Sequence, residues 1–73
     1  MPLITVELFP GRSPEKKREL VQALTDTYVE VCGGKPQAVT ILLKEVDPGD
    51  WGVGGKTYAE IIAESKAQTQ VQE

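Results

Sequence analysis

The spacing of apolar residues predicts a strand, a long helix and a second strand in that order. β-Branched and large apolar residues fill positions 3–9 up to the Pro10-Gly11 pair, so we expect a strand over about 3–9. A similar run over 39–46 predicts the second strand. Its nearly continuous apolar middle is typical of a strand that is covered on both faces.

The segment between these strands predicts a helix over 14–32. Ser13 is a good N-cap, and Pro14 is tolerated at the first helical position. Apolar residues then recur at three- and four-residue spacing, as on one face of an amphipathic helix: Leu20, Val21, Leu24, Tyr28, Val31 and Cys32. Gly33-Gly34 ends the helix. A strand, a helix and a strand predict a β-α-β unit with parallel strands.

The rest of the chain predicts a turn, a glycine-rich segment and a short helix. The turn occupies 47–50, and three glycines surround Trp51 and Val53 in the next segment. Thr57 is suited to cap a short helix that carries Tyr58, Ile61 and Ile62. We expect a disordered polar tail over about 67–73. The whole of 1–73 then forms one α+β domain.

Composition excludes several kinds of site and favours self-association. The chain has 73 residues, one cysteine and no histidine. It therefore lacks an internal disulfide, a His-based triad and the commonest zinc ligands, and we expect no metal. A domain this small buries only about 60% of its unfolded surface, so we expect a second copy to supply more burial. Cys32 is expected to be a packed core thiol and Tyr28 a core or interface residue.

Charge argues against nucleic acid and membrane partners. The net charge is −3, and the only basic run, 16–18, is flanked by Glu15 and Glu19 as on a solvated helix face. No segment has the ~20 apolar residues that a membrane span needs, and the N-terminus is unlike a secretory signal. A single unpaired cysteine suits a reducing compartment, so we expect a cytoplasmic protein.

Pro2 and Arg12 are the residues with candidate chemistry. Removal of Met1 would leave Pro2 as a secondary amine at the start of an apolar strand. Burial or a nearby guanidinium disfavours the ammonium form and lowers the pKa of such an amine, which suits a proton shuttle. Arg12 follows a Pro-Gly bend at the start of the predicted helix, where its guanidinium could bind a carboxylate through two parallel hydrogen bonds.

An ordered set of motifs resembles the 4-oxalocrotonate tautomerase family. Pro2 after Met1, Gly11-Arg12-Ser13 followed by 15–17 and Leu20, Glu45 at the end of the second strand, and the segment 49–55 keep the family's register over residues 2–55. The resemblance implies short β-α-β subunits with parallel strands and a C-terminal hairpin, which dimerise into a four-stranded sheet with two helices and assemble as a homohexamer. It also implies keto–enol tautomerisation of unsaturated 2-hydroxy acids such as 2-hydroxymuconate, with no metal or cofactor.

Carried over by position, the resemblance gives roles to individual residues. Pro2 would be the general base, and Arg12 would come from a neighbouring subunit to bind a substrate carboxylate. Trp51 stands where the family places an aromatic residue that lines the pocket. Further apolar wall would come from Leu3, Phe9 and Val53.

Two positions depart from patterns in this superfamily. The family's second substrate arginine falls on Thr40, whose hydroxyl is no substitute for a bidentate cation, so a dicarboxylate substrate loses one contact. Val53 stands where dehalogenase relatives use a water-activating glutamate, which disfavours hydration. The leading hypothesis is a tautomerase, and the alternatives are a non-catalytic oligomeric subunit of the same fold and a generic ligand-binding or regulatory β-α-β module.

Overall fold

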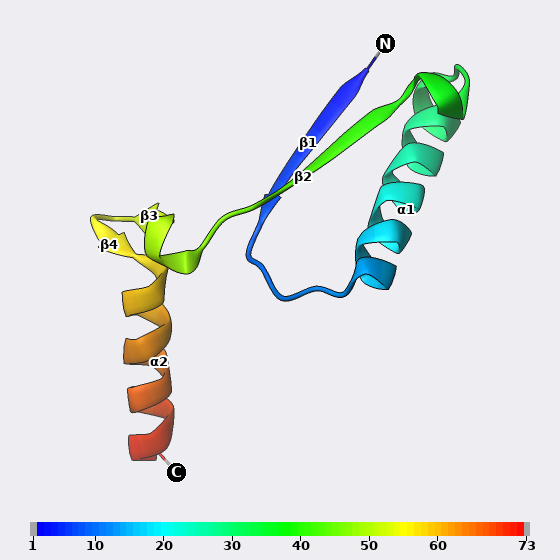
Figure 1. Cartoon of the computed structure of the whole chain (residues 1–73). Helices are drawn as coiled ribbons and strands as arrows, with labels where there is room; N and C mark the ends of the chain where they lie inside the picture. Colours follow the sequence, from blue (N-terminus) through cyan, green and yellow to red (C-terminus); the bar gives the residue numbers. More distant parts are fainter. Residues whose placement is uncertain (1, 73) are drawn as a thin grey trace.

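The computed structural model describes the backbone of residues 2–72 and the side chains of residues 2–66. The elements follow in the order β1 (Leu3–Leu8), α1 (Pro14–Cys32), η1 (Pro36–Ala38), β2 (Thr40–Glu45), η2 (Pro48–Asp50), β3 (Gly52–Val53), β4 (Lys56–Thr57) and α2 (Tyr58–Gln72) (Figure 1). The predicted strands and first helix are confirmed, the strands being shorter than predicted by one residue at one end of β1 and at each end of β2.

β1 and β2 form a parallel two-stranded sheet whose two faces differ in cover. Their register runs from Leu3 opposite Thr40 to Leu8 opposite Glu45. On the face that α1 covers, five apolar side chains are half-buried: Ile4, Val6, Leu8, Ile41 and Leu43 (Figure 1). The other face, which we call the open face, carries Leu3, Thr5, Glu7, Thr40, Leu42 and Lys44, all exposed. A single chain supplies one helix layer, so the second cover that the apolar run of β2 predicts would have to come from another copy of the chain.

Local contacts fix both ends of α1. Ser13 Oγ accepts a hydrogen bond from Lys16 N at 3.2 Å, which confirms the predicted N-cap. At the other end Gly33 has φ 81°, a value that favours glycine, and its N–H donates to Val29 O at 2.8 Å. The basic run is only partly the solvated face that we expected, because Lys17 Nζ lies 2.7 Å from Glu45 Oε2. This ion pair joins the first turn of α1 to the end of β2.

A tight antiparallel hairpin follows η2. Gly52 pairs with Thr57 and Val53 with Lys56, so the loop consists of Gly54 and Gly55 alone. Both loop residues have positive φ, 61° and 89°, as a two-residue hairpin turn of type I′ requires. The hairpin returns the chain to its starting point, where Tyr58 N donates to Trp51 O at 2.7 Å.

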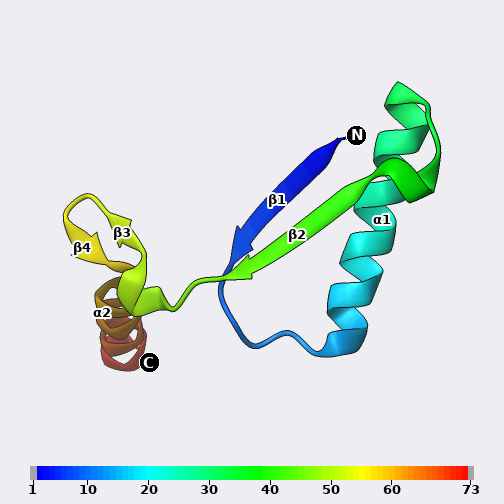
Figure 2. The same cartoon turned by 45° about the horizontal axis from the view of Figure 1, so that its top comes forward.

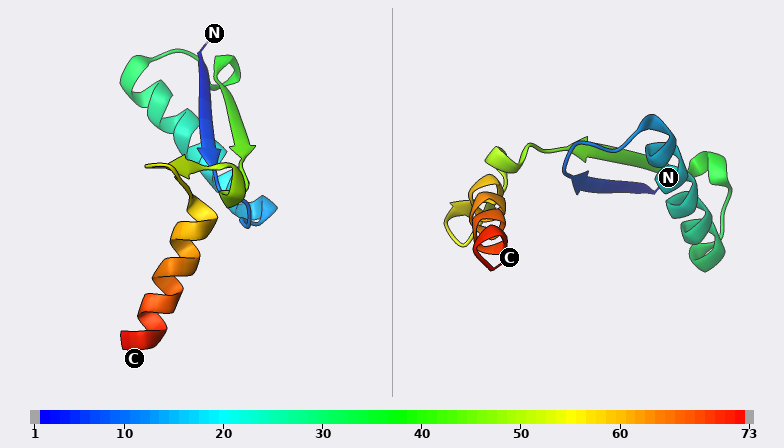
Figure 3. Two further views of the ribbon diagram at one scale, coloured as in Figure 1. Left: turned by 90° about the vertical axis from the view of Figure 1, so that its left-hand side faces the viewer. Right: turned by 90° about the horizontal axis from the view of Figure 1, so that it is seen from below.

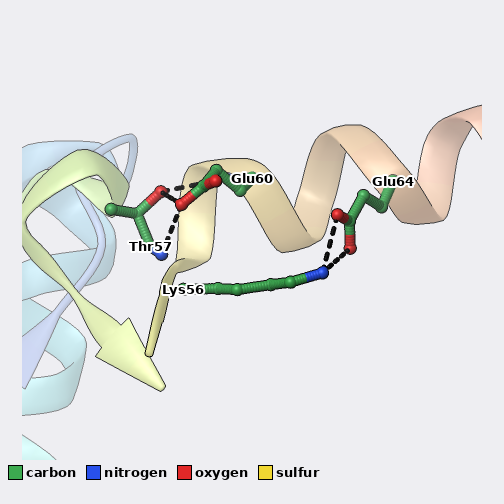
Figure 4. A network of polar contacts seen from close by, with 4 residues as sticks. All are labelled: Lys56, Thr57, Glu60 and Glu64. Atoms are coloured by element: carbon green, nitrogen blue, oxygen red, sulfur yellow. Dashed lines mark hydrogen bonds and ion pairs between the residues drawn. The ribbon is translucent and has the colours of Figure 1, made fainter. Parts of the chain in front are cut away.

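Reciprocal side-chain contacts begin α2 (Figure 4). Glu60 Oε1 accepts from Thr57 N at 2.8 Å and from Thr57 Oγ1 at 3.0 Å, while Glu60 N donates to Thr57 Oγ1 at 3.2 Å. This is a capping box, and it confirms Thr57 as the predicted cap. The hydrogen bonds from Thr57 lower the pKa of Glu60, and the hydrogen bond and charge of Glu64 raise the pKa of Lys56.

α2 is longer than the sequence predicted. It continues to Gln72, through most of the segment for which we expected a disordered tail. A capped helix adds residues at little cost once its first turn exists, and alanine and glutamine in the segment are good helix formers. Met1 and Glu73 lie outside the described residues, so the predicted removal of Met1 stays a prediction.

The isolated chain is extended and lacks a closed core. The two helices extend from opposite sides of the molecule (Figures 2 and 3). The radius of gyration is 16.9 Å, against about 11 Å for a compact domain of this length. The accessible surface is 5701 Å², against about 4,450 Å² for a compact monomer of this mass. Within residues 2–66 no apolar side chain is fully buried.

Cys32 is exposed, contrary to the predicted core position. Helical spacing places an apolar residue on a face but does not supply a surface to cover it, and the adjacent Val31 is 76% exposed as well. Tyr28 is half-buried, which agrees with a core or interface position. Over the described part of the chain, neither helix has the length and apolar character that crossing a membrane requires.

Candidate active site

Pro2 and Thr40 meet where the parallel sheet begins. Pro2 O accepts a hydrogen bond from Thr40 N at 3.0 Å, and Leu3 lies opposite Thr40 in the register. Pro2 is half-buried, whereas Leu3 is 59% exposed. We call Pro2, Leu3 and Thr40 the proline end of the sheet. It presents a small surface that is apolar apart from one hydroxyl.

Arg12 lies beyond the other end of β1, next to an aromatic cluster. Its Nη1 donates to Phe9 O at 2.8 Å. The Phe9 ring contacts Trp51 edge-on, with centroids 4.6 Å apart, and lies 4.8 Å from the Tyr58 ring. We call Arg12, Phe9, Trp51 and Tyr58 the aromatic end. Val53, from the adjacent β3, is 49% exposed.

Sequence reasoning placed Tyr58 on a helix face and missed its contact with Phe9. The available signal was the two-glycine hairpin, because a hairpin of that length returns the chain to its start. The residue that follows the hairpin must therefore lie beside Trp51, and the 2.7 Å hydrogen bond between the two backbones shows that it does.

Arg12 keeps most of its hydrogen-bonding capacity for a ligand. A guanidinium has five N–H donors in a planar fork, and the Phe9 carbonyl accepts from Nη1 alone. Arg12 is exposed and has no ion pair with any described carboxylate. Its loop is fixed by the Lys17–Glu45 ion pair on one side and by Phe9 on the other. A planar carboxylate is the ligand that such a fork suits.

A shallow cavity of about 260 Å³ lies beside Trp51. Its lining comes from the end of the open face and from the segment after β2: Glu7, Val46, Asp50, Trp51 and Gly52. The cavity therefore has one aromatic wall and two carboxylates. Asp47 accepts from Gly49 N at 2.8 Å, which stabilises the η2 turn that carries Asp50 and confirms Asp47 as a turn residue.

A single chain separates the two ends of the candidate site. β1 has six residues, and at about 3.3 Å per residue it holds Pro2 and Phe9 on the order of 20 Å apart. The N-terminus and the hairpin accordingly lie at opposite ends of the sheet in Figure 1. The structure thus brings Pro2 together with Thr40, and Arg12 together with Phe9 and Trp51, but it does not bring the two groups together.

Comparison with known proteins identifies the family to which the chain belongs. The family model described as "Tautomerase enzyme" matches residues 2–61, which include both ends of the candidate site. The chain belongs to the 4-oxalocrotonate tautomerase family. A probable tautomerase of Halalkalibacterium halodurans is 35% identical over 60 residues, which cover 82% of this chain and 98% of the relative.

Solved structures of the family have the same fold. TomN, a 4-oxalocrotonate tautomerase homologue from the tomaymycin biosynthetic pathway, has a TM-score of 0.81 at 42% identity and covers 85% of this chain and 95% of its own. A 4-oxalocrotonate tautomerase isozyme of Methylibium petroleiphilum has a TM-score of 0.82 at 35% identity, and the match covers 86% of this chain and 98% of the isozyme. A heterohexameric 4-oxalocrotonate tautomerase of Chloroflexus aurantiacus has a TM-score of 0.77 at 34% identity, and the match covers 84% of this chain and 98% of that chain.

This tautomerase carries a segment beyond the family match. The match ends at residue 61, so most of α2 lies outside it. Family membership supports tautomerase, that is isomerase, activity for the chain. The roles of Pro2, Arg12, Trp51, Thr40 and the apolar wall residues stay predictions.

Proposed function

We propose that this tautomerase interconverts the enol or dienol and keto forms of a small unsaturated 2-hydroxy or 2-oxo carboxylate without a cofactor. The observation that supports it best is an unpaired guanidinium fixed beside an aromatic cluster, together with a half-buried proline at the start of the sheet. The first can hold a carboxylate against an apolar wall, and the second can supply a base.

The chemistry is a proton transfer with no net change in composition. After removal of Met1, the Pro2 nitrogen takes the proton from the enol hydroxyl. The oxygen's electron pair forms the C=O bond, the C=C electron pair shifts to carbon, and the Pro2 ammonium returns a proton there as a new C–H bond. Half-burial and the guanidinium that a partner chain would bring both disfavour the ammonium, so we expect the amine pKa to lie near the working pH.

Arg12 and the apolar residues position the substrate. The guanidinium fork binds the substrate carboxylate and draws electron density toward it, which favours the developing enolate. Trp51 and Phe9 form the wall beside that fork, and Val53 extends it. Leu3 and Thr40 lie beside Pro2 and complete the site.

Two chains are needed to assemble this site. Because β1 separates Pro2 from Phe9 and Arg12 by on the order of 20 Å, an antiparallel pair of subunits would place the proline end of one against the aromatic end of the other. Arg12 and Trp51 would then arrive together, since both contact Phe9. The open sheet face and the exposed apolar side chains support self-association to a dimer and a homohexamer, and one relative is a heterohexamer.

Replacement of the base tests the proposal. We expect Pro2→Ala to lower kcat/KM for ketonisation of phenylenolpyruvate or 2-hydroxymuconate, followed by absorbance, by about 10²- to 10⁴-fold, the range that general acid–base groups contribute. The variant's far-UV circular dichroism and elution volume should match those of the parent, which shows that the assembly is intact. An unchanged rate would remove Pro2 from the mechanism.

A second candidate function is a non-catalytic subunit that supplies Arg12 to the site of a partner chain. The neutral Thr40 beside Pro2 favours it, because the proline end then offers no charged group to a substrate. Mass spectrometry separates the two functions. A chain that keeps Met1 has no free Pro2 amine and supports the scaffold role, whereas a mass lower by one methionine supports the enzyme.

A further inference from the structure

The two ends of the site together offer one cation to a substrate. At the proline end, Pro2 contacts Thr40, and the side chains of Thr40 and Leu3 are both uncharged. At the aromatic end, Arg12 is the cation, and it donates to the carbonyl of Phe9, whose ring contacts Trp51 and Tyr58. A charged group buried without a partner is costly, so a site with one cation suits a ligand with one carboxylate.

The cavity beside Trp51 carries charge of the wrong sign for a second carboxylate. Glu7 and Asp50 both line it, together with Val46 and the Trp51 ring. Lys44 lies opposite Glu7 in the register, but it is not part of the lining. A substrate that Arg12 holds and that lies along Trp51 would extend its far end toward these two carboxylates. An uncharged far end avoids that repulsion and packs on the aromatic wall.

We propose, on the basis of the proposed function, that the substrate is a 2-hydroxy or 2-oxo monocarboxylate with an uncharged, apolar remainder, and that dicarboxylates are disfavoured. Arg12 binds the single carboxylate, the aromatic end contacts the apolar remainder, and Glu7 with Asp50 repels a second anionic group. Thr40 and Glu7 are then specificity-determining positions.

A matched pair of substrates tests the preference in the unmodified protein. 2-Hydroxymuconate and 2-hydroxypenta-2,4-dienoate share the dienol and differ in the distal carboxylate, and phenylenolpyruvate adds an aromatic remainder. We expect kcat/KM for each monocarboxylate to exceed that for 2-hydroxymuconate by about tenfold or more, the effect of one charge-assisted contact. A preference for 2-hydroxymuconate would overturn the proposal.

Charge variants locate the cause of the preference. Thr40→Arg adds a cation beside Pro2, and Glu7→Gln removes an anion from the cavity. Each should raise kcat/KM for 2-hydroxymuconate relative to 2-hydroxypenta-2,4-dienoate, Thr40→Arg by about 10- to 100-fold. Glu30→Gln removes an exposed carboxylate from α1, remote from the cavity lining, and should leave the ratio unchanged. A ratio that both site variants leave unchanged would contradict the assignment to these residues.

Failure of the proposed function gives a different result. If Pro2→Ala leaves all rates unchanged, or if none of the three substrates is converted, the tautomerase mechanism fails. Calorimetric binding of phenylpyruvate against 2-oxoadipate then still decides the charge preference, because it requires no turnover. Tighter binding of phenylpyruvate supports a monocarboxylate site, and tighter binding of 2-oxoadipate overturns it.

Discussion

Arg12 owes its position to the bend before it and to one backbone acceptor. Gly11 has φ 123°, which favours glycine, and the Arg12 Nη1–Phe9 O hydrogen bond holds the guanidinium at the backbone of the residue whose ring contacts Trp51 and Tyr58. The sequence identified Arg12 from its place after a Pro-Gly pair at a helix start. Its exact neighbours were beyond sequence reasoning, because Trp51 and Tyr58 reach Phe9 only through the geometry of the later hairpin.

Substitution of Arg12 tests its role in binding the carboxylate. Arg12→Ala removes a charge-assisted contact of about 1.5–3 kcal/mol, so we expect kcat/KM for phenylenolpyruvate to fall about 10- to 100-fold. Arg12→Lys keeps the charge but loses the planar fork of donors, so its kcat/KM should lie between those of the parent and of Arg12→Ala. Arg18→Ala, an exposed arginine on α1, is the control and should keep the parent's rate. Equal rates for Arg12→Ala and Arg18→Ala would exclude Arg12 from substrate binding.

At the scale of elements, the caps were predictable and the extent of the last helix was not. Ser13 and Thr57 are recognisable because a hydroxyl at an N-cap satisfies a free backbone N–H, a local rule that needs no tertiary information. The length of α2 depends on propagation from a first turn that the Glu60 carboxylate closes. The open face follows from the count of layers, since two strands and one helix leave one face of the sheet without cover, but the apolar run of β2 does not reveal what covers that face.

The capping box predicts a pH dependence of the first turn of α2. Hydrogen bonds from Thr57 lower the pKa of Glu60 below its ordinary value of 4.5. The stabilisation is therefore complete above about pH 4.5 and is lost as the pH falls through the lower folded-state pKa. Backbone chemical shifts of residues 58–63 should report falling helicity in that acid range. Glu60→Gln should show lower helicity and a flatter profile, whereas Glu30→Gln should follow the parent. A parent profile that is flat down to pH 2 would contradict the prediction.

At the scale of the whole molecule, the sheet is too small to enclose a core. The chain exposes about 1,250 Å² more than a compact monomer of its mass, which exceeds the roughly 800 Å² that each partner buries in a standard interface. Leu42, on the open face, is 44% exposed and Leu3 is 59% exposed. The small size and the incomplete β-α-β layer already indicated self-association, and the extended shape of the chain agrees with it.

Leu42→Glu distinguishes an interface from an ordinary surface position. In an isolated chain, an exposed substitution changes the free energy of unfolding by no more than about 0.5 kcal/mol. In an assembly that buries the open face, the same change places an unpaired carboxylate in the interface, which costs much more.

Sedimentation velocity should therefore show the parent at a multiple of 8.0 kDa and Leu42→Glu in a smaller assembly. Ala23→Glu, an apolar-to-acid change on the outer face of α1, should sediment as the parent does. Because the proposed site joins Pro2 of one chain to Arg12 of another, Leu42→Glu should also lose activity in proportion to the assembly lost. A fully active monomer would contradict a site that is built from Pro2 of one chain and Arg12 of another.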